Sequence, residues 1–236
     1  MNHDPRISIV LATYNERENI RDTIQGIFLY LPDSEVIVVD DDSPDGTGRV
    51  AADVGDPRVK VICRVGTRGL ASAFNRGIIE SRGEIVGWMD ADMSMPPRLL
   101  PQMIDKLKEY DIVIGSRYVP GAKDDRAPLR VYASWLINRL AALVLGYGIK
   151  DYDSGFVVLR RSVFNRVSII PTGYGAYFME FLYACRKKDL TVYEVPYVFR
   201  DRAKGVSKSA PSLFRFMKTG FQYVLRIFVA RCRKLD

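Results

Sequence analysis

The stretch Ile85-Val-Gly-Trp-Met-Asp-Ala-Asp92 joins a short apolar run to two carboxylates two positions apart. Such a run is typical of a buried strand, and strand side chains two positions apart point the same way. Two like charges so close repel unless a cation lies between them, and Mg2+ or Mn2+ takes such oxygen ligands together with substrate phosphates. The stretch therefore predicts a metal–diphosphate site, although a polar strand end or a helix cap would also explain an isolated Asp-x-Asp.

Similar apolar runs predict further buried strands at residues 7–12, 35–40, 59–63 and 112–115. Helices are predicted between them at about 15–31, 70–81 and 97–109, and Asn15 with Glu18 fits a capping box at the start of the first. Alternating strands and helices of this kind indicate an α/β fold in which a mostly parallel sheet has helices on both faces.

Polar clusters follow four of these strands, at residues 14–16, 40–42, 90–92 and 116–117. In open α/β sheets, ligands bind at the carboxyl ends of the strands, so the repeated placement supports a single binding site there. The sequence contains neither GxGxxG nor GxxxxGK[ST], which argues against a dinucleotide-binding fold and against a P-loop.

The composition limits the possible partners. The 236 residues carry a net charge of +7, which suggests an anionic partner such as a nucleotide or a phospholipid surface. We predict no nucleic-acid partner, because the charges are dispersed and the acidic motifs converge on one sheet edge. The widely spaced Cys63, Cys185 and Cys232 are typical of reduced thiols in a cytosolic protein.

The second half of the chain is less regular. Residues 121–128 form a polar loop that we expect to be mobile, and helices are predicted at 131–145 and 176–187. Strands are predicted at 157–159 and 192–198, and a basic loop follows at 200–208. We divide the chain into a catalytic domain, residues 1–211, and a C-terminal helical segment, residues 212–236.

The final segment has the pattern of a basic amphipathic helix. Its basic stripe comprises Arg215, Lys218, Gln222, Arg226 and Arg233, and apolar side chains fill much of the remaining surface. This pattern suits the interface of an anionic membrane, although a helix that packs on the core with a solvated basic stripe would look the same. No apolar run reaches the roughly 18–20 residues of a membrane span, so we expect peripheral attachment.

Several motifs together resemble one family. They are Tyr14-Asn15-Glu16-Arg17-Glu18-Asn19, Asp40-Asp41-Asp42-Ser43-Pro44-Asp45-Gly46-Thr47, Asp90-Ala91-Asp92, Gly115-Ser116-Arg117-Tyr118, Ser154-Gly155-Phe156 and Arg202-Ala-Lys-Gly-Val-Ser-Lys208. This set resembles the dolichol-phosphate (polyprenol-phosphate) mannose synthases, which are inverting GT-A glycosyltransferases of family 2. The resemblance covers most of the chain, from about Ile7 to about Lys208.

The resemblance implies roles for individual residues. The nucleotide and sugar would be bound by Ala12, Tyr14, Glu16, Val39, Asp41, Asp90 and Ala91. Mg2+ or Mn2+ would be bound by Asp92 with Ser94, and the hydroxyl of Ser94, a poor ligand, favours a bridging water. The acceptor phosphate would be bound by Arg117, Arg130, Ser134, Arg202 and Lys208, with residues 153–156 on the acceptor side. Asp92, Arg117 and Arg202 would be the catalytic residues.

The implied reaction transfers mannose from GDP-mannose to a polyprenyl phosphate and gives a β-linked product. The acceptor phosphate is already an anionic nucleophile, so positioning and charge stabilisation suffice without a strong general base. The nearest alternative is a UDP-glucose or other UDP-sugar enzyme, against which Asp42 weighs because many of those enzymes have Gly there. A non-catalytic or nucleic-acid-binding basic protein is more remote. The expected location is the cytoplasmic face of a prokaryotic plasma membrane or of the endoplasmic reticulum, with a possible membrane-anchoring subunit.

Overall fold

The computed structural model describes residues 6–172, 175–200 and 213–233, and their side chains except those of 213–219. Two of the predicted phosphate-binding residues, Arg202 and Lys208, lie outside the described residues, as do the side chains of Arg215 and Lys218.

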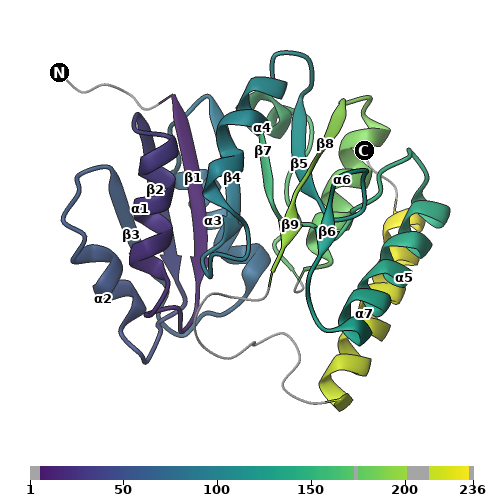
Figure 1. Ribbon diagram of the computed structural model, residues 1–236, viewed down its shortest axis with the longest axis horizontal. Helices are drawn as coiled ribbons and strands as arrows, with labels where there is room; N and C mark the ends of the chain where they lie inside the picture. The colour runs from purple at the N-terminus through teal and green to yellow at the C-terminus, as the bar shows by residue number, and fades with distance from the viewer. Residues whose placement is uncertain (1–5, 173–174, 201–212, 234–236) are drawn as a thin grey trace.

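A seven-stranded sheet forms the centre of the molecule (Figure 1). Its strands are β1 (Ile7–Thr13), β2 (Ser34–Asp40), β3 (Val59–Cys63), β4 (Ile85–Asp90), β5 (Ile112–Ser116), β7 (Val157–Arg160) and β8 (Val192–Pro196). They are ordered β3-β2-β1-β4-β7-β5-β8, and β7 alone among them runs antiparallel to its neighbours. The carboxyl ends of the parallel strands therefore meet at one edge, where β7 begins, and the predicted mostly parallel α/β fold is confirmed.

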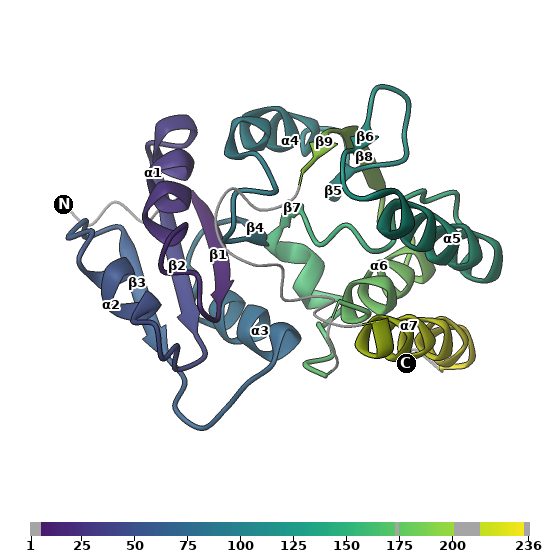
Figure 2. The same ribbon diagram turned by 60° about the horizontal axis from the view of Figure 1, so that its bottom comes forward.

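Helices cover both faces of the sheet (Figures 1 and 2). One face packs on α1 (Ile20–Tyr30), α2 (Thr47–Ala52) and α4 (Leu100–Lys106), the last of which follows a 3-10 turn at Pro97–Leu99. The other face packs on α3 (Leu70–Glu80) and α6 (Tyr177–Lys187), and a second 3-10 turn, Arg161–Asn165, follows β7. Alternate residues of β1 face the two cores: Val10 lies in one, and Ile9 and Leu11 lie in the other.

Two long helices, α5 (Pro128–Leu145) and α7 (Leu213–Cys232), lie side by side beyond the β8 end of the sheet (Figures 1 and 2). Ile227 and Ala230 anchor α7 in the core. Both helices also leave apolar side chains in solvent: Leu129, Tyr132, Trp135, Leu136, Leu143, Phe221, Leu225, Phe228 and Val229. We call these nine side chains the α5–α7 apolar surface. Across the described ranges, none of the helices has the length and apolar character that a bilayer crossing requires.

The basic stripe predicted on the final helix is only partly in solvent. Arg226 and Arg233 both donate to the buried carboxylate of Glu180 on α6, at 2.7 and 2.8 Å. These two arginines therefore serve a buried carboxylate of the core, as the alternative of a helix packed on the core allows, and the membrane role of the segment stays a prediction.

Two local predictions also fail. The capping box at Asn15 is absent: α1 begins at Ile20 and has no side-chain cap, while Asn15 has a left-handed φ of 56°. The loop at 121–128 contains a short strand, β6 (Lys123–Asp124), which pairs in parallel with β9 (Val198–Phe199). A ladder therefore holds this loop, and its polar residues gave no alternating pattern from which a strand could be predicted.

Candidate active site

Three of the predicted nucleotide and sugar residues lie side by side across the sheet. Ala12 on β1 is in register with Val39 on β2 and with Asp90 on β4. The strand order reverses around β1, whose neighbours are β2 on one side and β4 on the other. Such a switch point is where α/β sheets bind ligands, so this row of residues lies where a nucleotide site is expected.

Two carboxylates of the motif at residues 40–47, those of Asp40 and Asp45, hold the loops that follow β1 and β2. Asp40 accepts hydrogen bonds from Thr13 Oγ1 at 2.8 Å and from the Ser43 backbone N–H at 2.9 Å. Asp45 accepts from Thr47 Oγ1, and Thr47 Oγ1 in turn accepts from the backbone N–H of Glu16. This network fixes residues 13–17, so these carboxylates position the predicted residues Tyr14 and Glu16.

Asp41, which the resemblance assigns to the nucleotide site, is held by protein partners. Its carboxylate is buried and accepts from Arg64, with 2.7 Å between Nε and Oδ1, and from the Gly69 backbone N–H at 2.9 Å. Arg64 is held further by Ser72 Oγ at 2.9 Å. Asp41 thus anchors the loop of residues 64–69 through protein partners, and its part in nucleotide binding stays a prediction.

The same loop carries Arg68, for which the sequence predicted no role in the site. The Arg68 guanidinium lies 4.0 Å from the centroid of the Tyr14 ring and donates to the Tyr14 hydroxyl. A cation over an aromatic face is a stable arrangement that also offers outward-facing donors. Arg68 is exposed at the β2–β3 side of the switch point.

The Asp-x-Asp pair lies where β4 ends. The strand stops at Asp90, so strand alternation does not reach Asp92, and that reason for pairing the two carboxylates is wrong. Asp92 lies in a turn instead, where Oδ1 accepts from the Ser94 backbone N–H at 3.1 Å and Met93 adopts a left-handed φ of 65°. Positive φ at a bulky residue is costly and persists where a site requires it.

This turn suits a cation that substrate oxygens complete. The described residues contain no group of three or more His, Cys, Asp or Glu side chains that could hold a metal by themselves. Ser94 Oγ, however, is buried and has no hydrogen-bond partner among those residues. A carboxylate beside a buried, unsatisfied hydroxyl fits Mg2+ or Mn2+, which protein sites often hold through one or two carboxylates plus phosphates and water.

Arg117 lies at the carboxyl end of β5 and is almost fully buried against Asp151. Nε donates to Oδ2 at 2.8 Å, Nη2 donates to Oδ1 at 2.7 Å, and the Arg117 backbone N–H donates to Oδ2 at 2.8 Å. Burial lowers the pKa of Arg117, but the adjacent Asp151 carboxylate outweighs burial and holds that pKa above its ordinary value. Arg117 is therefore a rigid, permanently charged group.

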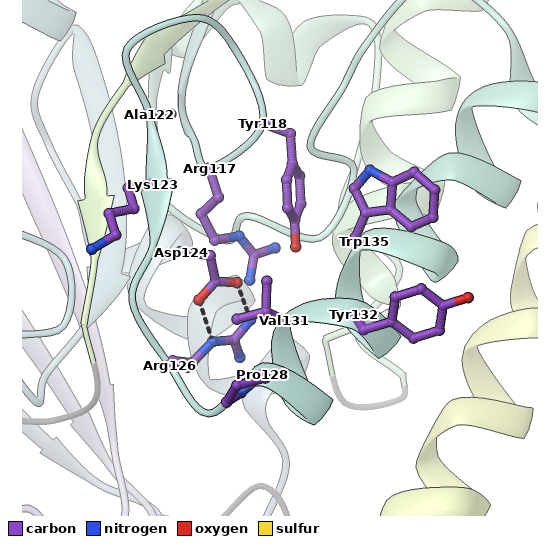
Figure 3. A pocket seen from close by; sticks show the side chains of 10 residues that line it. All are labelled: Arg117, Tyr118, Ala122, Lys123, Asp124, Arg126, Pro128, Val131, Tyr132 and Trp135. Atoms are coloured by element: carbon purple, nitrogen blue, oxygen red, sulfur yellow. Dashed lines mark hydrogen bonds and ion pairs between the residues drawn. The ribbon is translucent and has the colours of Figure 1, made fainter.

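A cavity of about 520 Å3 opens beside Arg117, between β6 and α5 (Figure 3). Its polar lining includes Arg117, Lys123, Asp124 and Arg126. Arg126 donates to Asp124 through Nε at 2.8 Å and through Nη2 at 2.6 Å, and the Arg117 guanidinium points toward this pair (Figure 3). The sequence offered no signal for Arg126 beyond its charge in a polar loop.

The other side of the cavity is aromatic. Tyr118, Tyr132 and Trp135 line it, and the last two project from α5 with large parts of their rings in solvent (Figure 3). Two residues that the resemblance assigned to the acceptor phosphate, Arg130 and Ser134, lie on α5 but do not line the cavity. Burial raises the pKa of Tyr118, while Arg117 and the Ser134 hydroxyl beside it lower that pKa.

A model of the family described as "Glycosyl transferase family 2" matches residues 8–168. The chain belongs to glycosyltransferase family 2. Among its relatives, a dolichol-phosphate mannosyltransferase of Pyrococcus furiosus is 38% identical over 231 residues, which cover 94% of this chain and 63% of the relative. The chain therefore spans less than two thirds of that protein's length.

Two further relatives are matched over most of their own length. A polyprenol monophosphomannose synthase of Mycolicibacterium smegmatis is 34% identical to this chain, and the match covers 89% of this chain and 83% of that protein. An undecaprenyl-phosphate mannosyltransferase of Micrococcus luteus is 33% identical to this chain, and the match covers 86% of this chain and 87% of that protein.

Solved structures confirm the GT-A type of fold. A glucosyl-3-phosphoglycerate synthase from Mycobacterium tuberculosis, in complex with Mn2+, UDP and phosphoglyceric acid, superposes with a TM-score of 0.74. The match covers 97% of this chain and 79% of that chain at 20% identity, so the likeness concerns the fold alone.

Proposed function

We propose that this family-2 glycosyltransferase transfers mannose from GDP-mannose to a polyprenyl phosphate, with inversion at the anomeric carbon. The observation that carries the proposal is the cavity beside Arg117, in which arginine donors face exposed aromatic side chains of α5. A lipid phosphate is complementary to this combination, because its head is anionic and its chain is apolar. The names of the three relatives, each a mannosyltransferase or mannose synthase with a lipid-type acceptor, support the same acceptor and sugar.

The nucleotide sugar would lie across the row formed by Ala12, Val39 and Asp90, with its diphosphate toward Asp92. Asp92 would hold Mg2+ or Mn2+, with Ser94 close by through a water, and the cation would supply charge neutralisation for the diphosphate. Two neighbours in the structural comparison contain UDP with Mn2+ or with Mg2+. The β2–β3 side of the switch point, with Tyr14 and Arg68, would then receive the base.

The acceptor phosphate would bind at the arginine side of the cavity. Each cation that lines it is already in an ion pair: Arg117 with Asp151, Arg126 with Asp124, and Lys123 with Asp125. Their remaining N–H groups can orient a phosphate. Arg202 and Lys208, which lie outside the described residues, are proposed to add to the positive charge there.

The sugar transfer at this site would depend on how the protein positions the acceptor phosphate against the anomeric carbon. A phosphate oxygen is anionic near neutral pH, so it can attack the anomeric carbon without a protein base. Arg117 is well suited to hold that oxygen, because its ion pair with Asp151 fixes the guanidinium and so reduces reorganisation on binding. Attack from the face opposite the departing diphosphate gives the β-linked product.

A lipid acceptor requires the protein to work at a membrane surface. The α5–α7 apolar surface adjoins the cavity through Tyr132 and Trp135, and aromatic side chains of this kind favour the bilayer interface. We propose peripheral attachment through this surface at the cytoplasmic face of a plasma membrane or of the endoplasmic reticulum. A membrane-anchoring subunit could contribute.

The nearest alternative is a donor other than GDP-mannose, for example UDP-glucose. The purified protein is incubated with Mn2+, a short-chain polyprenyl phosphate and one radiolabelled donor at a time, and label in the organic phase is counted. The proposal predicts lipid-linked label from GDP-mannose at a rate at least tenfold above that from UDP-glucose. Preference for UDP-glucose would overturn the mannose assignment while leaving the enzyme class intact.

A further inference from the structure

Asp153, in the segment between α5 and β7, lies where three elements meet. Its backbone N–H donates to Asn138 Oδ1 of α5 at 3.2 Å, and its backbone carbonyl accepts from Arg117 Nη2 at 3.1 Å. Its carboxylate accepts a hydrogen bond from the Tyr223 hydroxyl of α7. One residue thus connects the phosphate-side arginine to the C-terminal helix.

Gly175 makes room for the contact between Tyr223 and Asp153. A Cβ atom at this position would lie 2.0 Å from Tyr223 Oη and 3.1 Å from Asp153 Oδ1. Any side chain there would push the hydroxyl away from the carboxylate. The contact therefore depends on a glycine in a segment that belongs to neither partner.

The charges around Asp153 come from several elements. Arg117 lies on one side, with 3.9 Å between Nη2 and Oδ2, and Asp151 lies behind Arg117. Tyr223 faces Asp153 from α7, and Arg126 acts from the loop before α5. Burial raises the pKa of Asp153 to about 6, Arg117 opposes that rise, Asp151 adds to it, and Tyr223 and Arg126 lower it.

These contacts set up a competition for Arg117. The Tyr223 hydroxyl satisfies the Asp153 carboxylate and keeps it at 3.9 Å from the guanidinium. Without that donor, Arg117 becomes the nearest strong partner, and a second carboxylate can close on a guanidinium that Asp151 already neutralises. An anionic ligand would then meet two carboxylates at Arg117.

We propose that Asp153 is a positioning residue through which docking of α7 by Tyr223 keeps Arg117 open to the acceptor phosphate. The proposal rests on the function proposed above, in which Arg117 contacts that phosphate. It gives the C-terminal helix a role in acceptor binding in addition to any role in membrane attachment.

The test compares KM for a short-chain polyprenyl phosphate with KM for the nucleotide sugar. Tyr223→Phe removes only the hydroxyl, and we expect a three- to tenfold rise in the acceptor KM with an unchanged donor KM. The double variant Tyr223→Phe/Asp153→Asn should restore the acceptor KM, because the competing charge is gone. Gly175→Ala should reproduce the Tyr223→Phe effect.

The matched control is Tyr183→Phe, which removes a different contact of α7. The Tyr183 hydroxyl on α6 accepts from Arg231 of α7 at 2.9 Å and is not among the groups that act on Asp153. If Tyr223 only held the helix in place, both Phe variants would change the acceptor KM alike and Asp153→Asn would not rescue. That result would overturn the proposal.

A second measurement separates this proposal from the proposed function. Carbon NMR of the Asp153 carboxyl should give a titration near pH 6 in the unmodified protein and a lower midpoint in Tyr223→Phe, because a carboxylate that closes on the Arg117 guanidinium is stabilised in its charged form. An unchanged or higher midpoint overturns the coupling whatever the enzyme transfers. A lowered midpoint with no lipid product from any sugar nucleotide would instead overturn the proposed function.

Discussion

Arg117 and Asp151 form a buried, two-pronged ion pair, in which Nε and Nη2 each donate to a different carboxylate oxygen, at 2.8 and 2.7 Å. The Asp151 side chain is fully buried, and that of Arg117 is 5% exposed. A guanidinium held in this way keeps its position when a ligand arrives.

Asp151→Asn tests the structural cost of that pair. Removing one partner of a buried pair leaves an uncompensated charge, so we expect a loss of about 3–5 kcal/mol in the free energy of unfolding. Urea denaturation measures it. The control is Asp56→Asn, which breaks the more exposed pair with Arg58 and should cost about 1 kcal/mol or less. Equal losses in both variants would contradict the role assigned to Asp151.

Arg68→Ala tests the nucleotide end of the site. Loss of a stacked, charged contact of about 1–2 kcal/mol should raise the Kd for GDP by about 5–30-fold, measured by calorimetry. Arg58→Ala is the matched control, because its guanidinium lies 3.9 Å from the Phe28 ring centroid, away from the switch point. If both variants bind GDP as the unmodified protein does, Arg68 has no part in nucleotide binding.

Asp92→Asn tests the metal site. The amide keeps the shape of the side chain but lacks the charge, so Mn2+ together with GDP should no longer raise the melting temperature, and turnover should fall by about 100-fold or more. Asp105→Asn, an exposed change on α4, should behave like the unmodified protein. Stabilisation by Mn2+ and GDP that survives in Asp92→Asn would exclude this carboxylate as the ligand.

The raised pKa of Asp153 predicts how stability changes with pH. Its pKa is about 6 in the folded protein and 3.8 ordinarily, so the folded state binds more protons between these values. Stability from this group therefore falls as pH rises from about 4 to 6. The variant Asp153→Asn lacks this proton. As pH rises from about 4 to 6, its free energy of unfolding should therefore increase relative to that of the unmodified protein, by up to about 2 kcal/mol. A constant difference from pH 4 to 7 would contradict this pKa assignment.

The α5–α7 apolar surface predicts membrane binding. Leu136→Glu and Phe228→Glu place charges on this surface and should each reduce sedimentation with anionic vesicles several-fold. Leu29→Glu on α1 is the control, because Leu29 is equally apolar and 73% exposed but lies elsewhere. Equal losses in all three variants would indicate a general charge effect.

The sequence predicts the sheet well because its strands are short, continuous apolar runs. Ile9, Val10 and Leu11 are all fully buried, as a strand covered on both faces requires. The start of α1 was missed because the hydrogen bonds that fix residues 13–17 come from Asp40 and Asp45, about thirty residues away. Such distant partners leave no local pattern.

In the candidate site, too, the partners that are distant in sequence could not be predicted. Motif likeness selected Asp41 and Arg117, but not their protein partners Arg64 and Asp151, which decide what each side chain can do. Arg126 lines the cavity because it follows β6, which pairs with β9. Each of these strands has only two residues, so no sequence periodicity predicts their pairing. The basic face of α7 was predicted from helical spacing, yet spacing alone does not show that Glu180 lies opposite it.

The most direct test of the central claim is the mass of the lipid product. The protein, Mn2+, GDP-mannose and a defined short-chain polyprenyl phosphate are incubated, and the organic extract is analysed by mass spectrometry with and without the acceptor. The account predicts one new species, equal to the acceptor plus a single hexose, that is absent without acceptor and strongly reduced with Asp92→Asn. An extract that contains only unmodified acceptor, under conditions where the protein binds GDP, would contradict it.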